Sequence, residues 1–172
     1  MAEFQSRIIR AMKLDPQLYE EVEADRSAMG QATGVVVMSA VGAGIGGMAM
    51  GGPGIVAATI AALFGWYIWA FLTYFIGTRL LPEPQTHADY GELLRTIGFS
   101  SAPGLIRVVG IVPGIAPLAF TIAGIWMLVA MVIAVRQALD YTSTWRAIAV
   151  CAVGWVVQLL IFAMLFPSPG GG

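Results

Sequence analysis

Residues 31–78 read QATGVVVMSAVGAGIGGMAMGGPGIVAATIAALFGWYIWAFLTYFIGT and contain no Asp, Glu, Lys, Arg or His. A helix needs roughly 20 apolar residues to cross a membrane, because it rises about 1.5 Å per residue through a hydrocarbon core about 30 Å thick. The stretch is therefore too long for one span and long enough for two. A GGPG motif at residues 51–54 is typical of a tight turn and divides it. The sequence thus predicts two membrane spans, at about residues 31–50 and 55–78.

Three further apolar runs follow, and arginines stand at or near their ends. They predict spans at about residues 93–112, 115–135 and 147–166. The expected fold class is therefore all-α: a polytopic membrane helix bundle with five transmembrane helices, preceded by a short amphipathic N-terminal helix. The expected domains are a cytoplasmic amphipathic and acidic helical segment at 1–30, a five-helix transmembrane domain at 31–166 and a flexible tail at 167–172.

The composition excludes several classes of protein. Hydrophobic residues make up 58% of the sequence and charged residues 11%, whereas soluble globular domains carry roughly 25% charged residues. The formal net charge of −1 argues against a nucleic-acid partner, which requires a basic surface. Cys151 is the only cysteine, so no intramolecular disulfide can form.

The segment before the first span carries two predicted helices. Residues 2–14 fit an amphipathic helix, whose apolar side is formed by Phe4, Ile8, Ala11 and Met12 and whose basic side is formed by Arg7, Arg10 and Lys13. This helix either lies on anionic headgroups or packs against the cytoplasmic side of the protein itself. Asp15-Pro16 is a helix start and predicts a second, acidic helix to about residue 28.

The basic residues are unevenly distributed between the two sides of a five-span chain. All Lys and Arg residues except Arg107 fall in the N-terminal segment or in the loops at 79–95 and 136–146. Because loops rich in Lys and Arg stay in the cytoplasm, the N-terminus is expected inside and the C-terminus on the opposite side.

Small and polar residues predict helix packing within the membrane. Gly42 and Gly46, and likewise Gly47 and Gly51, are small-xxx-small pairs that let helix backbones approach closely in lipid. Gln158 in the last span is expected to hydrogen-bond to a neighbouring helix.

The third span is the least regular of the five. Pro103 and Gly104 interrupt it, and a helix break is expected there because proline lacks a backbone donor and clashes with the preceding turn. Arg107 follows the break. It either snorkels to the headgroups or holds a lipid phosphate or a partner's carboxylate. Arg107, Arg136 and Arg146 are therefore candidate contacts for lipid or a protein partner.

The sequence predicts no catalytic residue, no cofactor and no metal site. His87 is the only histidine, whereas metal sites usually need several His, Cys or carboxylate ligands. The GAGIGG stretch at 42–47 matches a dinucleotide-binding pattern, but no strand precedes it and no acidic residue follows before Glu83. Glu92 and Arg95 are spaced to form an ion pair on one helix face.

Two stretches resemble a known family. They are YGELLRTIGFSSAPG at residues 90–104 and GIWMLVAMVIAVRQALDYTSTWR at residues 124–146. Both resemble the bacterial branch of the Yip-domain family, named for Ypt-interacting proteins, over about residues 30–166. The resemblance implies a five-helix membrane domain with a cytoplasmic N-terminus, in a bacterial inner membrane. Eukaryotic members bind Rab-type GTPases, but their Asp-Leu-Tyr-Gly-Pro motif is absent here, which argues against GTPase binding.

Two classes of function follow from these features. The leading one is a non-enzymatic scaffold, accessory subunit or membrane organiser, with membrane lipids and other membrane-protein subunits, or further copies of the chain, as partners. It would act through helix packing and cytoplasmic loop contacts. The alternative is a small lipid or solute transporter, or a lipid-binding protein, that uses the broken third span.

Overall fold

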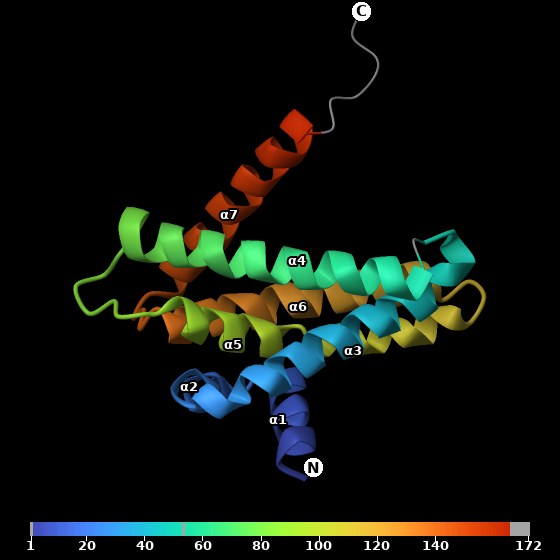
Figure 1. Ribbon diagram of the computed structural model, residues 1–172, viewed down its shortest axis with the longest axis horizontal. Helices are drawn as coiled ribbons and strands as arrows, with labels where there is room; N and C mark the ends of the chain where they lie inside the picture. The colour runs from blue at the N-terminus through green and yellow to red at the C-terminus, as the bar shows by residue number, and fades with distance from the viewer. Residues whose placement is uncertain (1, 53, 166–172) are drawn as a thin grey trace, which may run out of the picture.

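The computed structural model describes residues 2–52 and 54–165 as helices and short loops, with no strand in those ranges (Figure 1). In chain order the elements are α1 (Ala2–Met12), α2 (Pro16–Ala24), η1 (Arg26–Ala28), α3 (Met29–Gly47), η2 (Met48–Met50), α4 (Gly54–Phe75), η3 (Ile76–Leu80), α5 (Tyr90–Ser100), η4 (Ala102–Ile111), α6 (Ala116–Ala138) and α7 (Thr144–Leu165). The all-α class is therefore confirmed for this part of the chain. The predicted tail at 167–172 lies outside the described residues.

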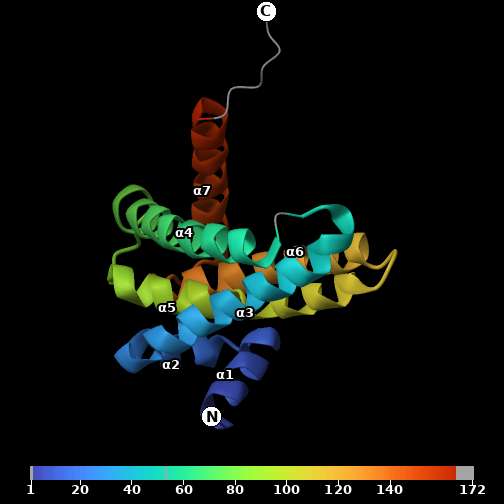
Figure 2. The same cartoon turned by 45° about the vertical axis from the view of Figure 1, so that its right-hand side comes forward.

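Four helical segments form a bundle: α3, α4, the α5–η4 pair and α6 (Figures 1 and 2). α3 packs against α4, α5 and η4, and α6 packs against α5 and η4. The loops at 81–89 and 139–143 lie together at one end, hereafter the charged end, and the turns at 51–52 and 112–115 lie at the other, hereafter the turn end. α7 begins at the charged end and leaves the bundle at a steep angle.

Three helices are long and apolar enough to cross a membrane: Arg26–Gly47, Gly54–Leu80 and Ala116–Ala138. They correspond to the first, second and fourth predicted spans. The third predicted span is divided between α5 and η4, and the fifth corresponds to α7, of which Thr144–Leu160 is a shorter apolar segment among the residues searched. The chain is thus an integral membrane protein by length and composition, and crossing by the third and fifth segments stays a prediction.

The third segment changes helix type where proline was expected to interrupt it. α5 ends at Ser100, and the amide of Ser101 donates to the carbonyls of Gly98 and Phe99. Pro103 then stands in the first turn of η4, a 3₁₀ helix of 10 residues. A 3₁₀ helix rises about 2.0 Å per residue, so η4 covers about 20 Å and carries the chain to the turn end.

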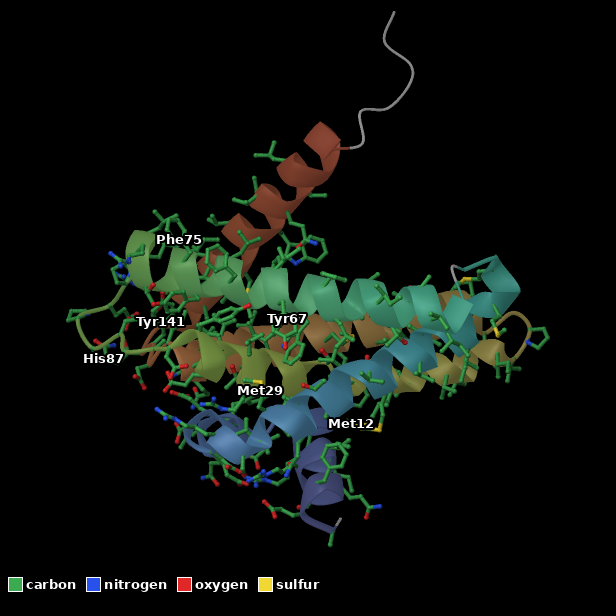
Figure 3. The ribbon with its side chains drawn as sticks, viewed as in Figure 1. Met12, Met29, Tyr67, Phe75, His87 and Tyr141 are labelled. Carbon is green, nitrogen blue, oxygen red and sulfur yellow. The ribbon has the colours of Figure 1, made fainter. Side chains whose placement is uncertain are left out.

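The two N-terminal helices pack onto the bundle. The ring of Phe4 lies against Gly34 of α3, and Ala11 is fully buried. Met12, at the end of α1, packs against the same hydrophobic core (Figure 3). On α2, Leu18, Tyr19 and Val22 are fully buried, and Asp15 caps the helix by accepting a hydrogen bond from the amide of Gln17. Of the two interpretations of the amphipathic helix, the structure therefore supports packing against the protein itself.

The expected ion pair between Glu92 and Arg95 is wrong. Asp89 and Glu92 form a capping box at the start of α5, in which the Glu92 carboxylate accepts from the Asp89 amide at 2.7 Å. The guanidinium of Arg95 points instead to the end of α2, where it donates to the carbonyls of Val22 and Glu23. Glu92 is engaged in the helix cap and Arg95 is engaged by the docked α2, so the two side chains do not pair with each other.

Candidate functional site

Glycines bring α3 against the backbone of η4. A Cβ atom on Gly46 would overlap the carbonyl oxygen of Arg107, and one on Gly42 would lie 3.3 Å from the carbonyl oxygen of Leu105. From the other side, a Cβ atom on Gly104 would overlap the hydroxyl of Ser39 on α3. The small-xxx-small pair Gly42 and Gly46 thus packs within the chain, and it fixes the position of η4.

The second glycine pair does not form a comparable contact. A Cβ atom on Gly47 would lie 3.7 Å from the ring of Phe120 on α6. Gly51 follows η2 with φ 71°, a left-handed conformation that ends the helix, and no described atom lies within 4 Å of a Cβ built on it. The place of Gly51 therefore reflects its turn conformation and not helix packing.

Arg107 projects from η4 into the interior between the helices. Its guanidinium lies over the ring of Phe120, with the carbon atom of the guanidinium 5.6 Å from the ring centre. Its Nε atom is buried, and no hydrogen-bond partner for it exists among the described residues. Burying a charged group costs free energy unless the group is paired, so this arginine lacks an acceptor among the described residues that its burial calls for.

Two adjoining cavities of about 440 Å³ and 350 Å³ meet at this arginine. They share five lining residues: Trp69, Arg107, Met127, Met131 and Gln158. The larger cavity continues between α6 and α7, and the smaller one continues between α3 and α4. Their volumes fall in the range of about 300–1,000 Å³ that is typical of sites for small molecules.

The lining is apolar apart from a few groups. In the larger cavity, Arg107 and Gln158 are the polar side chains among the described lining residues, apart from the indole N–H groups of Trp69 and Trp155. The Trp69 indole donates to the sulfur of Met131 at 3.3 Å. No described residue that lines either cavity carries a carboxylate. This hydrophobic space with one cation and one amide, hereafter the Arg107 cavity, suits an amphiphile with a negatively charged group.

The other two candidate arginines lie at the charged end and support loops. Arg136 donates to the carbonyls of Tyr141 and Thr142, at 3.2 and 3.3 Å. Arg146 donates to the carbonyl of Pro82 at 2.7 Å and lies 3.4 Å from the carboxylate of Glu83. Both therefore brace the backbone of this end, and the structure does not bring them near Arg107.

The loops at the charged end are joined into one surface. The Glu83 carboxylate accepts hydrogen bonds from the amide and the hydroxyl of Thr142, which hold the pKa of this carboxyl below its ordinary value. The hydroxyl of Tyr141 lies 2.7 Å from the carbonyl oxygen of Leu81, and burial raises its pKa to about 12. Tyr141 and His87 are seen at this end in Figure 3.

A buried charge network joins α1, α2 and α3. The side chain of Arg7 is 6% exposed and contacts three carboxylates, those of Glu3, Glu21 and Asp25, at 3.0, 2.8 and 2.9 Å. It also donates to Gln31 at 3.0 Å. The sequence placed Arg7 on a basic face but did not reveal this network. Glu3 lies on α1 itself, but Glu21, Asp25 and Gln31 come from later segments and meet Arg7 only when α1 docks.

Glu23 on α2 has the most perturbed acidic group of the charged end. Burial, followed by the nearby carboxylates of Asp140, Glu92 and Glu20, raises its pKa to about 8, and Arg95 opposes this shift. Among the described residues, no group of three or more His, Cys, Asp or Glu is arranged to hold a metal ion. The buried position of Glu23 in the docked α2 disfavours its charged form, so the ionisation of Glu23 weakens the docking of α2.

The cavity includes residues that the sequence did not single out. Met127 and Met131 are one helical turn apart and Gly124 stands one turn earlier, so all three lie on one face of α6. That spacing was readable from the sequence, but an apolar stripe on a membrane helix more often contacts lipid or a neighbouring helix. Likewise, nothing in the sequence distinguished Trp69 as a cavity residue from the other aromatic residues of the second span.

A comparison with known protein families assigns the domain. The model of the Yip1 domain matches residues 17–165. The chain belongs to the Yip1 family. The matched range begins inside α2 and ends at the last residue of α7, so α2, the bundle and α7 are all parts of the Yip1 domain, and α1 precedes it. Searches of curated proteins and of solved structures found no match.

Proposed function

We propose that this Yip1-family chain is a non-enzymatic scaffold, accessory subunit or membrane organiser that acts through helix packing and contacts at the charged end. The observation that carries this proposal is the position of α7, which leaves the bundle (Figures 1 and 2). α7 contacts α4, η3 and α6, and Trp155, Val156, Leu159 and Leu160 on it are each more than half exposed. A membrane helix that stands apart from its own bundle is suited to pack against a helix of another subunit.

The charged end supports the same function. Gln85 donates to the carbonyl of Asp140 at 3.1 Å, and Gln137 donates to Glu20 of α2 at 2.7 Å. These bonds join two loops, the end of α6 and α2 into one continuous polar surface, which a soluble partner or the soluble part of a subunit can contact. Five spans, a cytoplasmic N-terminus and a location in a bacterial inner membrane complete the proposal, because the basic loops gather at this end and Arg107 is the one basic residue toward the turn end.

A photo-crosslinking experiment in native membranes tests the scaffold function. A photoreactive amino acid is placed at Val156, on the exposed part of α7, and in a control at Val135, which is fully buried on α6. We expect a crosslink to a protein, either a second copy or a subunit in fixed proportion, from position 156 and none from position 135. Crosslinks to lipid alone from position 156 would contradict a packing role for α7.

A second function, lipid binding, is supported by the Arg107 cavity. The cavity combines apolar walls with an arginine whose Nε has no partner among the described residues. Such a site has no use in a purely structural bundle, where a hydrophobic residue would pack better. Retention of lipid by the protein after extraction in mild detergent, measured by mass spectrometry, tests this function, and a lipid-free protein would contradict it.

A further inference from the structure

The Arg107 cavity is open on the side where α7 departs from α6. Its walls there are Leu128 of α6 and Trp155 and Leu159 of α7, and both α7 residues are more than half exposed. In a bilayer this opening adjoins hydrocarbon and not water. An occupant must therefore present an apolar chain to these walls, which makes a free inorganic anion a poor ligand.

The polar part of the cavity requires an anion. A guanidinium carries five N–H donors in a planar fork that matches the oxygens of a phosphate, and the amide of Gln158 adds a further donor to the same cavity. No carboxylate among the described lining residues can neutralise Arg107 or receive a cationic headgroup. A lipid with a quaternary ammonium would bring a second positive charge beside the arginine.

The depth of Arg107 suits a lipid headgroup. Arg107 stands five residues before Val112, the residue that follows η4, so a rise of about 2.0 Å per residue places its backbone about 10 Å from the turn end. A long arginine side chain extends toward the headgroup level from such a depth. A phosphodiester drawn slightly inward from the adjoining leaflet can therefore meet the guanidinium.

We propose that the Arg107 cavity binds one phospholipid of net negative charge. Its phosphodiester contacts the guanidinium of Arg107 and the amide of Gln158, and one acyl chain lies between α6 and α7 along Trp155 and Leu159. This inference rests on the second function, lipid binding, and adds the class of lipid and the residue that selects it.

Native mass spectrometry of the full-length protein in mild detergent tests the inference. Phosphatidylglycerol and phosphatidylcholine with the same acyl chains are compared on the wild type, on Arg107→Gln and on Arg79→Gln, a control that removes one exposed arginine at the charged end. We expect the wild type and the control to retain phosphatidylglycerol at least tenfold better than phosphatidylcholine. Arg107→Gln should lose this preference.

The outcomes separate the inference from the function on which it rests. A wild type that retains both lipids equally keeps lipid binding but overturns the selection of anionic lipid, and a wild type that retains neither overturns both. An unchanged preference in Arg107→Gln, or an equal loss in Arg79→Gln, overturns the assignment to Arg107. Inorganic phosphate alone should not raise the melting temperature. A rise equal to that given by phosphatidylglycerol would overturn the assignment of a lipid as the ligand.

A measurement on the wild type keeps the inference testable should the variant fail to fold. Bromine atoms on an acyl chain quench tryptophan fluorescence at short range, and Trp69 and Trp155 both line the cavity. Brominated phosphatidylglycerol should quench at a lower concentration than brominated phosphatidylcholine, at least tenfold. Equal quenching by the two lipids would overturn the proposal.

Discussion

Two regions of this Yip1-family protein bury arginine in opposite ways. In the N-terminal layer, Arg7 is surrounded by three carboxylates and an amide, and Arg95 donates to two carbonyls of α2. In the bundle, Arg107 has a buried Nε with no partner among the described residues and an aromatic ring beside it. A paired buried arginine holds elements together, whereas an unpaired one costs free energy that a ligand can recover. The contrast separates a structural charge from a binding charge.

The largest effect is expected when the paired arginine is removed. Arg7→Met leaves Asp25 without its cation and leaves Glu21 paired with Arg10 alone. It should lower stability by about 2–3 kcal/mol, less than the loss of a fully buried pair, because both carboxylates are partly exposed. The exposed Arg26 offers a matched control, Arg26→Met. Thermal melting in detergent, with hydrogen exchange over α1 and α2, measures both variants. Equal behaviour of the two would show that the Arg7 network contributes nothing.

The glycine contact that positions Arg107 should come next. Gly46→Ala places a methyl group on the carbonyl oxygen of Arg107, and overpacking of this kind costs about 1–3 kcal/mol. Gly30→Ala on the same helix is the control, because no described atom lies within 4 Å of its added Cβ. The difference in melting temperature between the two variants is the measurement. A Gly46→Ala protein as stable as Gly30→Ala would rule out the close approach of α3 and η4.

A smaller effect is expected from pH at the charged end. Burial raises the pKa of Glu23 from its ordinary value of 4.5 to about 8, so docking of α2 disfavours the charged carboxylate. The free energy of unfolding should therefore fall as pH rises from 5 to 8 and stay constant above pH 8. The fall should be no more than about 1 kcal/mol, because the group is partly exposed. Asp15, Glu21 and Asp25 have lowered pKa values, so they act below this window.

The control for this effect is Glu23→Gln. Its hydrogen exchange over α2 should be independent of pH between 5 and 9, after correction for the intrinsic exchange rate. A wild type whose α2 becomes better protected as pH rises would contradict the direction of the shift.

The smallest effect on stability should come from the unpaired arginine. Arg107→Gln removes a charge that has lost its hydration without gaining a counter-ion. The free energy of unfolding without lipid should therefore change by less than about 0.5 kcal/mol or rise slightly. Thermal melting in lipid-free detergent measures this. A loss as large as that of Arg7→Met would reveal a structural partner for Arg107.

The sequence predicted the helices more closely than their arrangement. Hydrophobic length alone placed α3, α4 and α6 within a few residues, because the cost of burying charge in lipid leaves few alternatives. The break at Pro103 was readable for a local steric reason. The departure of α7 was not readable, because an apolar helix carries the same pattern whether it packs on its own bundle or on another subunit.

The candidate site was only partly predictable. The sequence singled out Arg107 because it is a charge inside an apolar run, and it singled out Gly42 and Gly46 through their spacing. It could not distinguish Arg107 from Arg136 and Arg146, which support loops, because that difference lies in contacts between segments distant in the chain. The Glu92–Arg95 ion pair failed for the same reason, since the docking of α2 determines the partner of Arg95.

The distinction between the two arginines is tested most directly by the rise in melting temperature that phosphatidylglycerol gives to the full-length protein. For Arg7→Met we expect a lower melting temperature in detergent but the same lipid-induced rise as in the wild type. For Arg107→Gln we expect an unchanged melting temperature in detergent and no lipid-induced rise. The same lipid-induced rise in both variants would contradict the division between a structural and a binding arginine.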